Sequence, residues 1–149
     1  MNTILTLQDI AQAWGAIAEQ QHKQFRVELP DSEMLLRGDE DRLQQVFLNV
    51  LGNAFKYTPP GATIRLEATV EGDTAVISVA DEGEGILPER LADIFDLFQR
   101  ATNTGSGLGV GLAVVRALVM AHDGTVTAAS AGLGQGTTIT IRLPLISRT

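Results

Sequence analysis

Asparagine and lysine residues stand at helical spacing in the first half of the chain, in a combination suited to a metal-bound phosphate. Asn49, Asn53 and Lys56 follow one another at intervals of four and three residues, so at about 100° per residue they share one face of a helix. Position alone favours a solvated face, because Arg42 and Gln45 lie on the same side. The residue types favour chemistry instead. Asparagine weakens a helix interior, an amide oxygen can ligate a hard cation, and a nearby lysine can contact a phosphate held by that cation.

A second group of candidate residues follows a predicted strand, in the run Asp81-Glu82-Gly83-Glu84-Gly85-Ile86. Alternating glycines let the backbone approach a flat ligand closely, and the carboxylate of Asp81 can accept a hydrogen bond from an exocyclic amine such as that of adenine. The alternative is an ordinary acidic surface turn. A calcium loop is disfavoured because the Asp-x-Asp-x-Asp-Gly ligand order is missing.

The third candidate is the glycine-rich segment GSGLGVGL at residues 105–112, directly before a predicted helix. Glycines ahead of a helix N-terminus expose backbone N–H groups to phosphate oxygens, and the helix dipole favours negative charge there. The segment lacks the Gly-Lys-Ser/Thr of a Walker loop and the Gly-x-Gly-x-x-Gly spacing of a dinucleotide site. Apolar residues interspersed from Leu108 to Val115 argue against a simple flexible linker.

Apolar periodicity predicts the helices that must position these residues. A stripe with a 3.6-residue period favours helices at residues 7–21, with Thr6 as N-cap, and at residues 40–58, with Asp39 as N-cap and a stop at Pro59-Pro60-Gly61. Pro88 introduces a short helix through Phe95. A last helix is predicted over residues 109–121, with Gly124 near the C′ position.

Alternating apolar residues predict the strands. Residues 25–29 and 34–37 form two short strands, and hairpins are expected at residues 64–79 and 125–143. Residues 99–106 carry no core-forming side chain and are expected to form a mobile loop. Helices mixed with antiparallel hairpins favour an α+β fold, a two-layer α/β sandwich.

Composition limits the classes of function. The 149 residues suit a single domain, residues 1–149, with 44% hydrophobic and 19% charged residues. Neither a membrane-spanning run nor a signal peptide is recognisable, so we expect no direct membrane contact. The absence of cysteine suits the cytoplasm. A net charge of −7 argues against a nucleic-acid groove.

The order of these motifs resembles a known family. The run DRLQQVFLNVLGNAFKYTPPGATI resembles the N box of sensor histidine kinases, DEGEGI their first glycine box, IFDLF their F box and GLGVGLAVV their second glycine box. HDGTV and GQGTTITIRLPL resemble the closing strands of the family. The similarity extends over residues 3–145, in the family's order and spacing, and it identifies the chain as resembling the ATP-binding catalytic domain of a histidine kinase.

The resemblance implies the Bergerat ATP-binding fold, a mixed sheet with three helices on one face. It also implies ATP and Mg²⁺ as ligands and a role for each matching residue. Asp81 would bind the adenine amine in a pocket shaped by Gly83, Gly85 and Ile86. Asn53 would ligate Mg²⁺ with Asn49 in support, and Lys56 and Tyr57 would line the phosphate and nucleoside side. The lid and the helix start would comprise Phe98, Arg100 (toward the γ-phosphate), Gly107, Leu108, Gly109, Gly111 and Leu112.

The resemblance further implies transfer of the γ-phosphoryl group of ATP to a histidine on a separate helical dimerisation hairpin, and indirectly to a response regulator. This chain has two histidines, His22 and His122, and neither lies in a His-Glu-x-x-x-Pro-like segment. We therefore expect the hairpin to be absent and the chain alone to be incomplete for autophosphorylation. His122 is expected at a helix C-terminus in a structural role.

Three alternatives stay open. An anti-sigma-factor serine kinase shares this fold and size, but usually has glutamate where Asn49 stands and histidine where Tyr57 stands. A non-catalytic module would bind the nucleotide for regulation alone. A structural domain without a ligand would require all three motif groups to be incidental.

Overall fold

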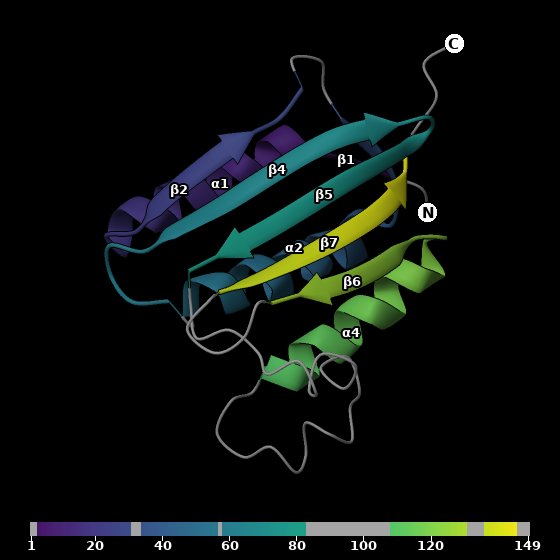
Figure 1. The fold of residues 1–149 in the computed structure, drawn as a ribbon. Helices are drawn as coiled ribbons and strands as arrows, with labels where there is room; N and C mark the ends of the chain where they lie inside the picture. Colours follow the sequence, from purple (N-terminus) through teal and green to yellow (C-terminus); the bar gives the residue numbers. More distant parts are fainter. Residues whose placement is uncertain (1–2, 31–33, 57, 83–107, 131–135, 146–149) are drawn as a thin grey trace.

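The computed structural model describes residues 3–30, 34–56, 58–82, 108–130 and 136–145. Within these residues a five-stranded sheet carries helices on one face (Figure 1), which confirms the predicted α+β sandwich. The helices are α1 (Leu7–Gln20), α2 (Glu40–Lys56) and α4 (Leu108–Ala121). The sheet comprises β2 (Gln24–Glu28), β4 (Thr63–Glu71), β5 (Thr74–Asp81), β6 (Thr125–Ala129) and β7 (Thr137–Pro144). The predicted helix at residues 88–95 and the loop at residues 99–106 lie outside the described residues.

The sheet is mixed, as the resemblance implied. Its strand order is β2-β4-β5-β7-β6; β2 runs parallel to β4, and the other pairs are antiparallel. A second, two-stranded sheet joins β1 (Thr3–Thr6) to β3 (Leu35–Gly38). The sequence predicted β3 but not β1, so the pairing of these two strands is new information from the structure.

Helix α2 forms the centre of the helical layer and begins where the sequence predicts. Asp39 caps it, because its Oδ1 accepts a hydrogen bond from the backbone N–H of Arg42 at 3.2 Å. The predicted apolar face is buried along its whole length, at Leu43, Val46, Phe47, Val50, Leu51 and Ala54. Burial of this face fixes the rotation of the helix about its axis.

Helices α1 and α4 end in the same way, with a left-handed residue that is not glycine. His22 (φ 57°) follows α1, and Asp123 (φ 63°) follows α4. After α4, the N–H of Asp123 bonds to the carbonyl of Met120 and that of Gly124 to the carbonyl of Val119, the pattern of a Schellman motif. Asp123 therefore occupies the C′ position, and Gly124 follows it at C″, in agreement with the prediction that Gly124 lies near C′.

His122 links the start of α2 to the end of α4. Its Nδ1 lies 2.8 Å from the carbonyl oxygen of Leu118, and its Nε2 lies 3.2 Å from the backbone N of Asp39. A neutral ring that donates from Nδ1 and accepts at Nε2 satisfies both contacts. Since α2 and α4 also pack against each other, they run antiparallel, and His122 has a structural role.

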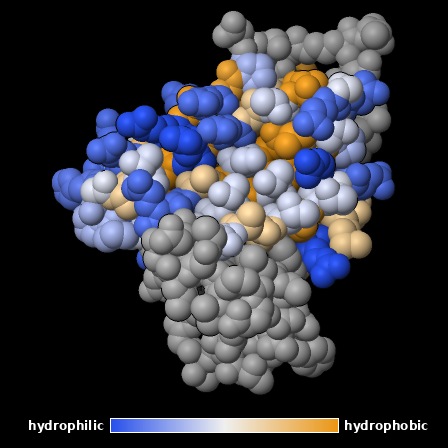
Figure 2. Space-filling view, viewed as in Figure 1, coloured by the Kyte–Doolittle hydropathy of each residue, from blue (hydrophilic) through white to orange (hydrophobic). Residues whose placement is uncertain are grey.

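The face of the sheet opposite the helices is mostly polar (Figure 2). On β4 it carries Arg65 and Glu67, which form an ion pair at 3.5 Å. In the middle of the sheet, Ser78 of β5 and Thr140 of β7 lie 3.4 Å apart through their hydroxyl oxygens. Within the described residues, no helix combines the length and apolar character needed to cross a membrane.

Substitution of Gly124 tests how closely the chain after α4 packs against the sheet. A Cβ at this position would lie 2.1 Å from the carbonyl oxygen of Arg142, so Gly124→Ala should lower the free energy of unfolding by about 1–3 kcal/mol. Gly15→Ala is the control, because a Cβ there meets nothing within 4 Å. It should raise stability by about 0.5–1 kcal/mol through helix propensity. Urea denaturation of both variants measures the effects; equal stabilities would contradict the predicted crowding.

Candidate functional site

One edge of the sandwich collects the predicted site residues that the structure describes. In the antiparallel register, Asp81 at the end of β5 is opposite Ile64 near the start of β4 and opposite Thr137 at the start of β7. Residues 57–62 connect the end of α2 to the start of β4, so α2 ends at this edge too. The backbone N–H of Thr63 donates to Oε1 of Glu82 at 2.7 Å. Figure 1 shows the last turn of α2 and the arrowhead of β5 at the same end of the molecule.

Asp81 is held by the strand beside it. Its side chain is partly buried, and its Oδ1 accepts a hydrogen bond from the backbone N–H of Thr137 at 3.2 Å. Gly136, with φ +77°, lies so close that a Cβ there would be 2.1 Å from the carbonyl oxygen of Asp81. A glycine is therefore required next to the backbone of Asp81. Sequence reasoning placed GQGTT in a closing hairpin and missed this support; the Gly-Thr pair at the strand start was the available signal.

The polar stripe of α2 lies on the flank that faces away from α1. At about 100° per residue, Asn49 and Asn53 are separated by more than about 100° from Phe47, which lies on the α1 side. Asn49 is partly buried, and its Oδ1 accepts a hydrogen bond from Nε2 of Gln45 at 2.8 Å. Lys56 is exposed at the end of the helix. The stripe thus extends from a partly buried amide to a solvent-accessible ammonium.

Asn53 differs from Asn49 in its hydrogen bonding. Its Nδ2 atom is buried and has no hydrogen-bond partner among the described residues. A buried polar group without a partner costs about 1–3 kcal/mol, so such groups are rare in folded proteins unless they serve a ligand or bound water. This orphaned amide is the strongest structural sign of a ligand site on α2.

The start of α4 reaches the same edge. His122 joins the end of α4 to the start of α2, and the two helices have 14 and 17 residues, or about 21 and 25 Å at 1.5 Å per residue. The first turn of α4 therefore lies alongside the last turns of α2. This turn contains the backbone of Leu108, Gly109 and Gly111, and a helix N-terminus favours anions.

The remaining predicted site residues divide into two groups. Leu112 belongs to the core, with its side chain only 1% exposed. The others lie outside the described residues: Tyr57, Gly83, Gly85, Ile86, Phe98, Arg100 and Gly107.

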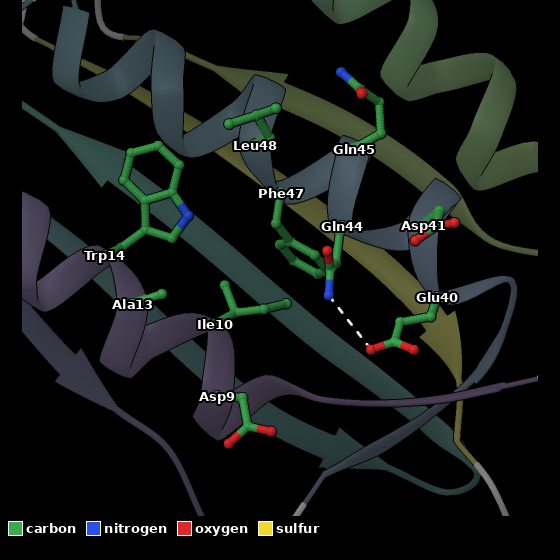
Figure 3. Close-up of a pocket in the computed structure, with 10 residues that line it drawn as sticks. All are labelled: Asp9, Ile10, Ala13, Trp14, Glu40, Asp41, Gln44, Gln45, Phe47 and Leu48. Carbon is green, nitrogen blue, oxygen red and sulfur yellow. Dashed lines mark hydrogen bonds between the residues drawn. The ribbon is translucent and has the colours of Figure 1, made fainter.

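A groove elsewhere on the helical layer contains none of the predicted site residues. It has a volume of about 390 Å³ and lies between α1 and α2 (Figure 3). Trp14 and Leu48 line one part of it, and a hydrogen bond of 3.5 Å joins Gln44 to Glu40. Gln45 also lines this groove and donates to Asn49, so the groove borders the polar stripe without including Asn49, Asn53 or Lys56.

The described residues are compatible with a metal ion that is coordinated mainly by a bound ligand and by water, with few protein oxygens. They contain no cluster of three or more His, Cys, Asp or Glu side chains that could form a protein cage. Mg²⁺ commonly keeps several waters and takes few protein oxygens together with substrate phosphates. The amide of Asn53, whose buried end is unpartnered, can supply one such oxygen, because rotation about χ2 exchanges its oxygen and nitrogen.

Comparison with known proteins identifies close relatives. A family model described as histidine kinase-, DNA gyrase B- and HSP90-like ATPase matches residues 38–147. The chain is 42% identical over 142 residues to the sensor histidine kinase TrcS of Mycobacterium tuberculosis, a region that covers 90% of this chain and 27% of that protein. The chain spans about a quarter of the length of the curated relatives it matches.

Solved structures share the fold. The mycobacterial sensor histidine kinase MprB superimposes with a TM-score of 0.82 at 26% identity, covering 97% of this chain and 98% of that one. Full-length ShkA in complex with AMPPNP superimposes with a TM-score of 0.77 at 30% identity, covering 96% of this chain and 30% of that one.

Asn53 and Asn49 form a matched pair for testing the site. Asn53→Leu removes an amide whose Nδ2 has no partner among the described residues, so the free energy of unfolding of the ligand-free protein should stay the same or rise by up to about 1 kcal/mol. Asn49→Leu removes the hydrogen bond from Gln45. Its free energy of unfolding should therefore be about 1 kcal/mol lower than that of Asn53→Leu. Both changes alter helix propensity equally, so thermal denaturation of the two variants compares the hydrogen bonding of the two amides. A larger loss for Asn53→Leu would show that its amide has a structural partner.

Proposed function

Because this chain belongs to the family of histidine kinase-, DNA gyrase B- and HSP90-like ATPases, we propose that it binds Mg²⁺-ATP at the edge described above and donates the γ-phosphoryl group to a histidine of a separate helical hairpin. The chain is an ATP-binding catalytic domain of the sensor histidine kinase type. The orphaned amide of Asn53 at this edge is the observation that carries the assignment of the site.

Asp81 is suited to the adenine end of the nucleotide. Its Oδ1 is engaged by the backbone N–H of Thr137, which fixes the direction of the carboxylate. A carboxylate has two oxygens and about four acceptor positions, so it can accept from the exocyclic amine of adenine as well. Guanine carries a carbonyl oxygen at the corresponding position, and two acceptors would then face each other. This geometry favours ATP over GTP.

The phosphates belong between α2 and α4. The first turn of α4 offers backbone N–H groups and the positive end of a helix dipole, and Lys56 adds a full positive charge at the end of α2. Asn53 would hold Mg²⁺, which supplies charge neutralisation between phosphate oxygens when it is bound. These local groups oppose the net charge of −7, which would otherwise disfavour a polyanionic ligand.

Phosphoryl transfer requires mainly positioning from this domain. A ring nitrogen of the acceptor histidine attacks the γ-phosphorus, the bond to the bridging oxygen breaks, and ADP leaves with the electron pair. A competing hydrolysis needs a base that activates water. Asn49 occupies the stripe next to Asn53, and its amide, which accepts a hydrogen bond from Gln45, cannot take a proton as a carboxylate does. The site is therefore suited to transfer more than to hydrolysis.

The partners follow from this reaction. The domain needs the dimerisation and phosphotransfer hairpin of its parent kinase as acceptor, and through it a response regulator. ShkA, which shares 30% identity with this chain, is described with AMPPNP, an ATP analogue, and this supports ATP as the nucleotide. The reaction places the domain in the cytoplasm, where ATP is abundant.

Incubation of the domain with labelled ATP, Mg²⁺ and the separately expressed hairpin of the parent kinase tests the proposal. Label should appear on the hairpin in an acid-labile, base-stable form, as phosphohistidine does. Acid-stable label on a serine would instead indicate a serine kinase. Nucleotide binding without any labelled protein would indicate a regulatory module and overturn the transfer step.

Asp81→Asn tests the adenine contact while preserving the shape of the side chain. The amide oxygen can still accept from Thr137, but its NH₂ group then faces the amine of adenine, so donor meets donor. Loss of a hydrogen bond to a charged group costs about 1.5–3 kcal/mol, which corresponds to a roughly ten- to hundredfold weaker ATP affinity. Calorimetric titration with ATP measures the change, and GTP serves as the control nucleotide. An unchanged ATP affinity would remove Asp81 from the site.

A further inference from the structure

Lys23 contacts the end of α2 although it lies 32 residues earlier in the chain. It directly follows the left-handed residue His22, and its backbone N–H closes the end of α1 by bonding to the carbonyl of Ala18 at 3.0 Å. The carbonyl of His22 in turn accepts from the N–H of Gly61, in the link that follows α2. The turn after α1 is thus tied to both helices, and the Lys23 side chain starts from a fixed backbone.

The Lys23 ammonium satisfies a carbonyl that the helix cannot satisfy itself. The last four carbonyls of a helix have no intrahelical partner. Near the end of α2, the hydroxyl of Thr58 lies 2.9 Å from the carbonyl oxygen of Ala54 and 3.4 Å from that of Phe55, and Lys23 Nζ donates to the carbonyl of Phe55. Thr58 is 5% exposed, so its contact is shielded from water. Two side chains therefore cap the last turn of α2: Thr58, which follows the helix, and Lys23, which lies in the turn after α1.

Aromatic packing holds the same turn. Phe55 is 2% exposed and contacts Trp14 of α1 and Phe25 of β2, with ring centroids 5.2 and 5.7 Å apart. Lys23 Nζ lies 5.8 Å from the centroid of the Phe55 ring, within the range of a cation–π interaction. Burial in this setting lowers the pKa of the Lys23 ammonium from its ordinary value of 10.5. Lys23 thus contacts both the backbone and the ring of Phe55.

We propose that Lys23 is a positioning residue for the phosphate end of the nucleotide site. It holds the carbonyl of Phe55, which lies between Asn53 and Lys56 in the chain, and so fixes the turn that carries both. The proposal rests on the function proposed above. Asp81 belongs to a different element, β5, and its partner Thr137 belongs to β7. Loss of the Lys23 contact should therefore weaken binding of the phosphates and metal without weakening binding of adenine.

Lys23→Met is the variant that tests this separation, because methionine keeps the apolar packing on Phe55 and removes the donor. Its affinity for Mg²⁺-ATP should fall roughly three- to tenfold, while its affinity for adenosine, which has no phosphate, should stay unchanged. Lys23→Arg restores a donor and a cation and should recover most of the Mg²⁺-ATP affinity. Arg26→Met is the matched control, since it removes a positive charge from an exposed position three residues away and should change neither affinity.

Calorimetry with Mg²⁺-ATP and nuclear magnetic resonance titration with adenosine provide these values. An unchanged Mg²⁺-ATP affinity in Lys23→Met would overturn the proposal. Equal losses for both ligands, or the same loss in Arg26→Met, would also overturn it, because they indicate general destabilisation or long-range charge. Should Lys23→Met fail to fold, Lys23→Leu, which also removes the donor and keeps apolar contact with Phe55, replaces it with the same criteria.

The side-chain amide signals of Asn53 in nitrogen-15-labelled protein give a readout that needs no nucleotide. They should shift in Lys23→Met and stay in place in Arg26→Met; identical spectra would contradict the positioning role. Absence of ATP binding by the unmodified domain would refute the proposed function separately, and the amide signals would then still decide whether Lys23 fixes the turn.

Discussion

Burial of one face of α2 against the sheet is the constraint on which the candidate site depends. Phe47 and Leu51 are 1% and 0% exposed, and a close-packed interior resists rotation of the helix that carries them. Asn49 and Asn53 stand at fixed angles from these residues, so their directions are set by the core. A rigid element of this kind places a side chain more accurately than a loop does. The apolar residues that pack α2 against the sheet therefore also determine the directions in which the side chains of Asn49 and Asn53 point.

The two edges of the sandwich differ in what closes them. At the edge where α2 starts and α4 ends, His122 joins the helices through both ring nitrogens, and Gly124 brings the chain against β7. The backbone N–H groups of Asp39, Asp123 and Gly124 are hydrogen-bonded to other protein groups there. At the opposite edge, Nδ2 of Asn53 has no hydrogen-bond partner among the residues that the structure describes, and Lys56 is exposed. An antiparallel helix pair that is tied at one end can accept a ligand at the other without loss of its packing.

Local patterns predicted most of the fold, because each long element repeats its own signal. The apolar stripe and the Asp39 cap gave α2, and alternation gave the β4–β5 and β6–β7 hairpins. What the sequence did not reveal depends on contacts between distant residues. β1 pairs with β3 more than 30 residues later, and Thr137 supports Asp81 across 56 residues. Lys23 offered no sign of its contact with Phe55. For the site, sequence predicted residue types and a common edge, but not which amide would lack a partner.

Two features of the candidate nucleotide edge are unfavourable for the isolated fold, and the ligand proposed here would offset their cost. The buried Nδ2 of Asn53 gives up water without gaining a partner in the described part of the chain, at a cost of about 1–3 kcal/mol. Gly136 has a positive φ and no side chain, which increases the backbone entropy lost on folding, yet its approach to Asp81 leaves no room for a Cβ. A ligand that binds only the folded state returns such costs through its own binding free energy. On the proposed function, binding of the nucleotide would therefore stabilise this edge relative to the free domain.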